Sequence, residues 1–267
     1  MKPILDLLSL KGRAALITGA TGGLGQVMAD VLAELGAELV LVDRPGTDLD
    51  GMAGRVASTR HVRVDARPCD LERQGERRRL IEGILAGEFR VNVLVNNAAF
   101  VGSSELSGWS VPFEQQSIET WRRALEVNVT AAFELAQGLA PMLRQAEGAS
   151  VINIGSIYGK YAPDWRLYAD TTMNNPAAYG VSKAGLLQLT RWLATALAPE
   201  VRVNSISPGG IQRGQPESFV ERYASRTPLG RMGSEEDFRG AVVYLATDLS
   251  RYVTGQDLAV DGGWGIW

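Results

Sequence analysis

The chain has 267 residues, of which 45% are hydrophobic and 21% are charged, which is typical of a soluble globular protein with a sizeable core. Its formal net charge is -3 and its acidic and basic residues are interspersed, so we expect neither a nucleic-acid partner nor a membrane partner. A single cysteine and a single histidine exclude an internal disulfide, a cysteine zinc cluster, a histidine triad and a multi-histidine metal site, so no metal is expected and any catalysis must use other groups.

The amino-terminal stretch 1–10 is apolar, but it is short and carries Pro3 and Asp6, which does not fit the apolar region of a signal peptide. No run in the chain approaches the ~20 apolar residues of a membrane-spanning helix. We therefore expect a cytoplasmic protein.

Short apolar runs alternate with helical patterns along the whole chain. Strands are predicted at 13–18, 38–42, 61–66, 91–95, 150–154, 201–206 and 258–260. Helices are predicted at 24–35, 71–85, 119–144, 177–198 and 234–249, with a short or irregular helix at 47–59 because of its two glycines. Residues 157–176 form a long insertion, 210–227 are expected to be a mobile segment, and the arginine run 77–79 is expected to be a solvated helix face.

The predicted strands are continuous Val, Ile, Leu and Ala runs without polar alternation, which indicates strands buried on both faces. Together with the alternation of strands and helices, this predicts an α/β protein. We expect a single-domain Rossmann fold over 1–267, with a doubly wound parallel sheet of about seven strands and helices on both faces. No linker or internal repeat divides the chain.

A glycine-rich turn, 18–25 (TGATGGLG), joins the first strand to the first helix. Glycines let backbone amides approach a pyrophosphate, and the helix N-terminus adds a favourable dipole. Alone, such a turn is equally a simple tight turn, but here Asp43 ends the next strand, where a carboxylate can accept hydrogen bonds from both ribose hydroxyls. We therefore predict dinucleotide binding, with contacts from Gly19, Thr21, Gly22, Gly23, Leu24, Asp43 and Arg44.

Asp43 also bears on the choice of cofactor. A carboxylate at this position repels a 2'-phosphate, and the turn offers no cation at Thr21 or Gly22. Arg44 is able to pair with a phosphate, although a surface arginine is the simpler interpretation. These residues favour NAD over NADP.

Tyr179 and Lys183 lie four residues apart in the predicted helix 177–198, so they share one face of it. A fixed ammonium beside a phenol favours the phenolate and lowers its pKa toward the range useful for proton transfer. By itself the pair is equally an amphipathic residue beside a solvated charge, so its meaning depends on the rest of the chain.

The glycine turn, the Tyr179–Lys183 pair and several further motifs together resemble the single-domain short-chain dehydrogenases/reductases, over essentially the whole length of the chain. The family's glycine motif matches 18–25, and its tyrosine-three residues-lysine motif matches Tyr179 and Lys183. One departure is Ala99, which stands where the family has glycine. Further matches, in chain order, are Asp70-Leu71, Asn96 to Ala98, Asn128, Ser156 and Pro208-Gly209.

The resemblance implies roles for these residues. Tyr179 would be the acid/base, and Ser156 would hydrogen-bond the substrate oxygen. Lys183 would hold the nicotinamide ribose and, with the positively charged nicotinamide, lower the pKa of Tyr179. Asn128 would hold a water that links Lys183 to solvent. Read singly, Ser156 is also an ordinary loop serine, Asn128 a satisfied polar residue and Asp70 a helix cap. The resemblance extends the predicted cofactor contacts to Cys69, Asp70, Leu71, Asn97, Ala98, Ala99, Tyr179, Lys183, Pro208, Gly209 and Ile211.

Substrate choice is expected in the loops at the carboxyl ends of the strands. The insertion 157–176 carries aromatic and basic side chains, which suit a polar carbohydrate, neutral or anionic, although the aromatics could equally pack the insertion onto its own domain. The predicted substrate contacts are Ser156, Tyr158, Trp165, Arg166, Tyr179 and Arg213. The second half of the chain also resembles oxidoreductases of flagellin-modification and legionaminic-acid-type sugar pathways.

The leading hypothesis is thus an NAD-dependent oxidoreductase that interconverts a secondary alcohol and a ketone on a sugar, sugar phosphate or nucleotide sugar. One alternative is an NADP-dependent 3-oxoacyl-carrier-protein reductase, and another is a non-catalytic dinucleotide-binding sensor or scaffold. Because members of the family are commonly tetramers, we expect a homotetramer with the apolar tail, Trp264 and Trp267, at or near a subunit interface.

Overall fold

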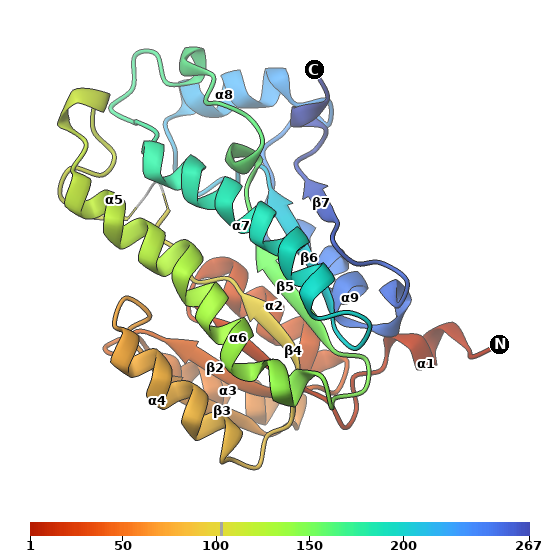
Figure 1. The fold of residues 1–267 in the computed structure, drawn as a ribbon. Helices are drawn as coiled ribbons and strands as arrows, with labels where there is room; N and C mark the ends of the chain where they lie inside the picture. Colours follow the sequence, from red (N-terminus) through yellow and green to blue (C-terminus); the bar gives the residue numbers. More distant parts are fainter. Residues whose placement is uncertain (102–103) are drawn as a thin grey trace.

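A central sheet of seven parallel strands organises the computed structural model, which describes residues 1–101 and 104–267 (Figure 1). The strands are β1 Ala14–Thr18, β2 Glu38–Asp43, β3 Val64–Pro68, β4 Val91–Asn96, β5 Ser150–Ile154, β6 Arg202–Pro208 and β7 Asp257–Val260. Their order is β3-β2-β1-β4-β5-β6-β7, and every neighbouring pair is parallel. The strand order reverses between β1 and β4, which in doubly wound sheets is where ligands bind.

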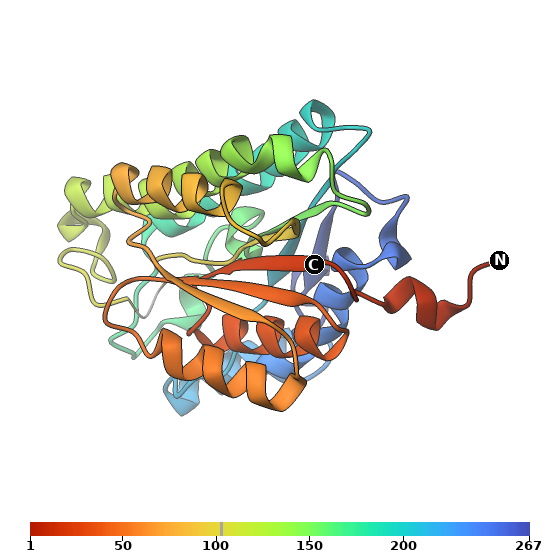
Figure 2. The ribbon, with the colours of Figure 1, turned by 90° about the horizontal axis from the view of Figure 1, so that it is seen from below.

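Helices cover both faces of the sheet, as Figure 2 shows, which confirms the predicted fold class. The helices α2, α3 and α9 lie on one face, and α4, α6 and α7 lie on the other. The helix bounds are α1 Ile4–Leu8, α2 Gly23–Glu34, α3 Leu49–Arg60, α4 Gln74–Leu85, α5 Ile118–Leu125, α6 Ala131–Leu143, α7 Ala177–Ala196, α8 Glu217–Arg226 and α9 Arg239–Ala246. No helix of the described chain combines the length and apolar character that a bilayer crossing requires.

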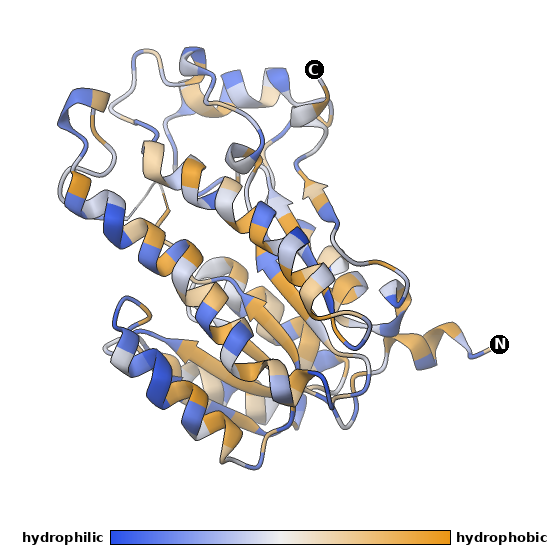
Figure 3. Ribbon diagram, in the orientation of Figure 1, coloured by the Kyte–Doolittle hydropathy of each residue, from blue (hydrophilic) through white to orange (hydrophobic). Residues whose placement is uncertain are grey.

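Two apolar clusters, one on each face, hold these layers together. Successive strand residues point to opposite faces, so Ile17 packs with α2 and α9 while its neighbour Leu16 packs with α4 and α6. Figure 3 shows the corresponding band of apolar residues along the strands, with hydrophilic residues on the outward faces of α4 and α5. Burial on both faces explains why the strands read as continuous apolar runs.

The long predicted helix 119–144 is interrupted. It consists of α5, one π-helical turn at Glu126–Thr130, and α6. The turn contains Asn128, whose buried side chain bonds to the backbone of Phe100 and to Ser182 instead of facing solvent. Apolar periodicity does not register such an inserted residue, because the two helices continue in nearly the same direction.

Three other predictions differ from the structure. The segment 47–59, expected to be short or irregular, is the regular helix α3, because Met52 and Val56 anchor it to the core. His61 ends this helix in the left-handed conformation, so the third strand starts later than predicted, at Val64. The segment 210–227, expected to be mobile, contains α8, whose Phe219 and Tyr223 are buried.

The arginine run also differs from its prediction as a solvated face. Arg78 and Arg79 are exposed, but Arg77 is only 1% exposed and lies between α4 and α6. Its guanidinium donates to Glu134 and Glu126 and to the backbone oxygen of Leu71, each at 2.5 Å. Arg77 therefore joins α4 to the π-helical turn that carries Asn128.

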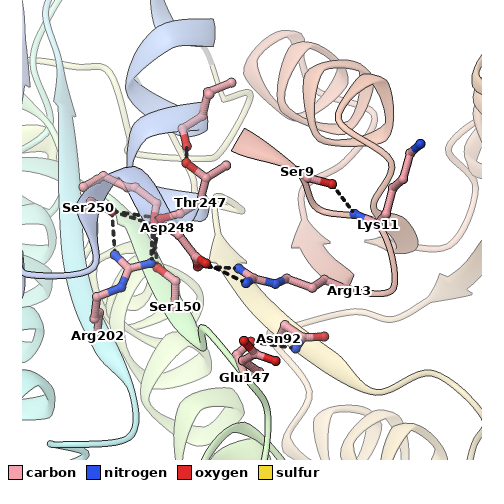
Figure 4. Close-up of polar contacts among 12 residues, drawn as sticks. Ser9, Lys11, Arg13, Asn92, Glu147, Ser150, Arg202, Thr247, Asp248 and Ser250 are labelled. Carbon is pink, nitrogen blue, oxygen red and sulfur yellow. Dashed lines mark hydrogen bonds and ion pairs between the residues drawn. The ribbon is translucent and has the colours of Figure 1, made fainter. Parts of the chain in front are cut away.

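Polar contacts connect the segments at the amino-terminal ends of the strands, opposite the carboxyl ends where a ligand is expected (Figure 4). Arg13 makes a two-pronged ion pair with Asp248 at 2.8 and 3.1 Å. Arg202 donates to Ser250 at 2.7 Å and to the carbonyl groups that end α9. Burial lowers the pKa of Arg202, but its ordinary value is so high that it stays charged. These contacts stabilise the fold and lie away from the candidate site.

Candidate active site

The glycine turn between β1 and α2 is shaped by two close backbone approaches. A Cβ atom on Gly19 would lie 2.8 Å from Cα of Ala98, and Gly19 has a φ of 63°. A Cβ atom on Gly25 would lie 2.2 Å from the carbonyl oxygen of Gly19. Only glycine fits at either position. The first amides of α2 consequently face the cavity, where they can donate to a phosphate.

The loop after β4 is tied directly to this turn. The side-chain amide of Asn97 donates to the carbonyl oxygens of Thr18 and Gly19, each at 2.9 Å. In return, the hydroxyl of Thr18 accepts from the backbone N–H groups of Asn97 and Ala98. Ala99, the departure from the family pattern, also lines the cavity. The ends of β1 and β4 thus form one rigid floor.

Asp43 stands at the carboxyl end of β2 and faces the same cavity. Its Oδ2 accepts from the backbone N–H of Thr21 at 2.8 Å and from the Thr21 hydroxyl at 2.7 Å, while its Oδ1 accepts from the N–H of Arg44 at 2.8 Å. A carboxylate has about four acceptor positions. One position on Oδ1 therefore remains for a ribose hydroxyl.

The segment after β3 forms the far end of the cavity, where Cys69, Asp70 and Leu71 lie. Asp70 accepts from the N–H of Glu72 at 3.0 Å, so it also stabilises the turn that precedes α4. Burial raises the pKa of the Cys69 thiol to about 11, which keeps it neutral at physiological pH. Cys69 therefore contributes surface and not reactivity.

Ser156, Tyr179 and Lys183 meet at the carboxyl end of β5, and all three line the cavity. The hydroxyl oxygen of Ser156 accepts from the N–H of Tyr158 at 3.1 Å, so its hydrogen can point to the Tyr179 oxygen or, when substrate is bound, to a substrate oxygen. Lys183 is 3% exposed and donates to the carbonyl oxygen of Ile154 at 2.6 Å. Its nitrogen lies 5.8 Å from the centre of the Tyr179 ring, on the shared face of α7.

Burial dominates the pKa values of this group in the chain without cofactor. It raises the pKa of Tyr179, and the Ser156 hydroxyl and the positive charge of Arg213 only partly oppose this. Burial also lowers the pKa of Lys183 to about 7, so near neutral pH its charge is only partly present. Both effects have the same cause, because a low-dielectric site penalises the charged form of each group.

Asn128 is oriented by three hydrogen bonds in the π-helical turn. Its Oδ1 accepts from the N–H of Phe100 at 2.8 Å, and its Nδ2 donates to the carbonyl oxygen of Phe100 and to the hydroxyl of Ser182. Ser182 in turn donates to the carbonyl oxygen of Tyr179 at 2.8 Å. Asn128 is fully buried and does not line the main cavity, so it positions α7 beneath the tyrosine.

The segment after β6 closes the other side of the cavity with Pro208, Gly209, Ile211 and Arg213. Arg213 pairs with Glu235 at 2.7 Å. A Cβ atom on Gly23 would lie 3.1 Å from a guanidinium nitrogen of Arg213. Arg213, predicted as a substrate contact, therefore lies beside the glycine turn, nearer to where a dinucleotide phosphate is expected.

The insertion contributes different residues from those predicted. Tyr158 lines the cavity, but Trp165 and Arg166 do not. Arg166 is engaged by the carboxylate of Asp164 at 2.8 Å, two residues earlier, and Trp165 packs on the outer side of Tyr168. Tyr168 and Asn175 line the cavity instead. The aromatic composition pointed to this segment, but only its folded path decides which rings face inward.

The tail is divided between the core and the surface. Trp264 is 2% exposed and stacks on Tyr223 with ring centres 5.9 Å apart, so it belongs to the aromatic cluster behind the cavity. Ile266 and Trp267 remain exposed. Trp264 therefore packs on its own chain, whereas the last two apolar side chains do not.

These residues enclose a cavity of about 1160 Å³ that runs from Asp70 past the glycine turn to Tyr168. A small-molecule pocket commonly measures roughly 300–1,000 Å³. The cavity therefore has room for a dinucleotide and a substrate together, with Ser156 and Tyr179 where the two would meet.

Comparison with known proteins agrees with this geometry. Residues 19–265 match a family model described as enoyl-(acyl carrier protein) reductase. The rhamnolipids biosynthesis 3-oxoacyl-[acyl-carrier-protein] reductase of Pseudomonas aeruginosa is 33% identical and aligns over 96% of this chain and 97% of its own. The chain belongs to the short-chain dehydrogenase/reductase family. Like the named members of this family, it is an oxidoreductase that acts on hydroxyl and keto groups.

Two other members of the short-chain dehydrogenase/reductase family act on polyhydroxylated compounds by name. Galactitol 2-dehydrogenase (L-tagatose-forming) of Cereibacter sphaeroides is 30% identical, over 97% of each chain. A gluconate 5-dehydrogenase from Burkholderia cenocepacia, solved with NADP and tartrate, superposes with a TM-score of 0.87 at 28% identity, over 99% of this chain and 100% of the other. The glycine turn and the floor formed by Asn97 fit the nicotinamide dinucleotide that such enzymes use.

Proposed function

We propose that this protein interconverts a secondary alcohol and a ketone on a polar, carbohydrate-type substrate, with NAD as cofactor and Tyr179 as acid/base. The observation that carries the proposal is the convergence of Ser156, Tyr179 and Lys183 at one end of a cavity whose other end is the glycine turn and Asp43. The substrate side offers hydroxyl and amide groups of Tyr158, Tyr168 and Asn175, which suit a polyhydroxylated compound. The polyol and gluconate relatives support the same substrate class.

The chain's own residues account for the proton transfer. The bound dinucleotide supplies the hydride acceptor or donor. The free hydrogen of Ser156 donates to the substrate oxygen, and the phenolic oxygen of Tyr179 takes the alcohol proton in oxidation or returns it in reduction. Lys183, held by the carbonyl oxygen of Ile154, can present its remaining hydrogens to ribose hydroxyls.

The substrate class is tested by incubating the purified protein with sugars, polyols, sugar acids, sugar phosphates and nucleotide sugars, each with NAD+ and NADP+, and following the absorbance of the reduced cofactor. We expect turnover within this panel. A second candidate, 3-oxoacyl-carrier-protein reductase, is favoured by the Pseudomonas aeruginosa relative and by the description of the matching family model. Turnover of an acetoacetyl thioester with NADPH, and of no member of the panel, would favour this candidate instead.

The cofactor preference is tested at Asp43. We expect NADH to bind at least ~10-fold more tightly than NADPH, because the Asp43 carboxylate, held by Thr21, faces a 2'-phosphate with like charge. Asp43→Asn is expected to narrow this ratio, with both dissociation constants measured by fluorescence titration. Asp50→Asn, on the exposed side of α3, is the matched control. Tighter NADPH binding by the wild type would contradict the proposal.

We further propose a homotetramer. The outward faces of α6 and α7 carry Phe133, Val181 and Trp192, with Trp192 59% exposed. Exposed apolar side chains of this kind are expected to be covered by another subunit. Sedimentation velocity at micromolar concentration should show a tetramer, and Trp192→Glu should shift it to smaller species. A wild-type monomer at that concentration would overturn the proposal.

A further inference from the structure

Two tyrosines and an asparagine of the insertion form a connected group inside the substrate end of the cavity. Tyr158 lies in the short helix Ile157–Gly159 directly after Ser156, Tyr168 follows the short helix Trp165–Leu167, and Asn175 precedes α7. The ring of Tyr158 meets the ring of Tyr179 edge-on, with centres 6.5 Å apart. The group therefore packs directly against the ring of the proposed acid/base, Tyr179.

Among the described residues, the hydrogen bonds of this group leave one phenolic hydrogen without an acceptor. The hydroxyls of Tyr158 and Tyr168 are 2.7 Å apart, and the amide of Asn175 donates to the Tyr168 oxygen at 3.0 Å. Two phenols carry two hydrogens, and their mutual bond uses one of them. Within 1–101 and 104–267, no acceptor is found for the other, whichever tyrosine carries it.

The spare donor is neutral and held in place. Burial raises the pKa of Tyr158 well above its ordinary value, so this phenol keeps its hydrogen at physiological pH. Tyr168 packs edge-on against Phe219 with ring centres 5.3 Å apart, and Tyr158 packs edge-on against Trp264 at 6.5 Å. Because both rings are fixed by neighbours, little side-chain entropy is lost when a ligand accepts the hydrogen.

We propose that the Tyr158–Tyr168 pair determines substrate specificity by donating one hydrogen bond to a second oxygen of the substrate, a hydroxyl or carboxylate oxygen beyond the carbon that reacts. A buried donor left without a partner disfavours a ligand that lacks this oxygen. The pair thus selects polyhydroxylated or hydroxy-acid substrates over simple alcohols and ketones. This inference rests on the proposed function and deepens its substrate class.

The test is a double-mutant cycle with Tyr158→Phe, Tyr168→Phe and the double variant. Tartrate, a dihydroxy dicarboxylate, is titrated calorimetrically into the full-length protein saturated with oxidised cofactor, so the readout does not need turnover. Each single variant keeps one unpaired phenolic hydrogen and should bind tartrate within about 2-fold of the wild type. The double variant has none and should bind at least ~10-fold more weakly. Tyr161→Phe, which packs on the same Trp264 outside the cavity, is the matched control and should bind like the wild type.

Activity gives a second readout. For a polyol that the wild type turns over, kcat/KM should fall at least ~10-fold in the double variant, whereas for cyclohexanol, which has no second oxygen, it should stay within about 3-fold. The proposal is overturned if the loss of tartrate affinity in the double variant equals the product of the two single losses, or if the double variant binds tartrate like the wild type. It is also overturned if kcat/KM falls equally for the polyol and for cyclohexanol, or if the wild type binds neither tartrate nor any polyol. If the tartrate affinities of the three variants change as expected but no polyol is turned over, the role of the tyrosine pair is supported and the proposed reaction is contradicted.

Discussion

Replacing Tyr179 with Phe is expected to lower kcat by roughly 10²- to 10⁴-fold, the range of a positioned acid/base. The phenolic oxygen is the group proposed to exchange the substrate proton, and Phe keeps the ring that packs edge-on against Tyr158. Cofactor affinity should stay within about 3-fold, because the glycine turn and Asp43 are untouched. Steady-state kinetics on the best substrate, together with a titration of the reduced cofactor, measures both quantities.

Tyr161→Phe serves as the control for loss of a hydroxyl from the same region, and it should keep wild-type kcat. Undiminished turnover by the Tyr179 variant would show that another group carries the proton. If even the wild type turned over no alcohol or ketone while binding the cofactor tightly, the sensor or scaffold hypothesis would be favoured instead.

Replacing Arg77 with Met is expected to lower the free energy of unfolding by about 3 kcal/mol, or roughly 100-fold in the unfolding equilibrium. The buried guanidinium is the shared partner of Glu126 and Glu134, and without it two carboxylates and the carbonyl oxygen of Leu71 lose their donor. Glu126 and Glu134 retain some exposure, which places the expected value at the lower end for breaking a buried pair. Urea denaturation followed by circular dichroism measures the change.

Arg78→Met is the matched control, since its side chain is 65% exposed and only its 3.9 Å approach to Glu134 would be lost. That variant should change the free energy of unfolding by less than about 1 kcal/mol. Equal effects of the two substitutions would mean that the burial of Arg77 contributes nothing beyond charge. Because Arg77 also holds the π-helical turn of Asn128, its variant should lose activity at temperatures where it is still folded.

The strands, the helices and their alternation along the chain were predictable because they depend on local periodicity. β1 is apolar from Ala14 to Ile17 because both of its faces are covered, and α2 begins directly at the glycine turn. Tyr179 and Lys183 were predictable as neighbours because a helix places residues four apart on one face. The interruption at Glu126–Thr130 was not, because its cause is a set of bonds to Phe100 and Ser182, far away in the sequence.

By itself, the sequence determined the fold class, the glycine turn and the placing of Tyr179 beside Lys183, all of which rest on spacings within a few residues. Only the tertiary structure decided that Arg77 is buried, that Tyr168 and Asn175 line the cavity while Trp165 and Arg166 do not, and that Trp264 packs on its own chain. The physical reason is that Arg77, Tyr168 and Trp264 pack against partners that are distant in the sequence, namely Glu134, Phe219 and Tyr223.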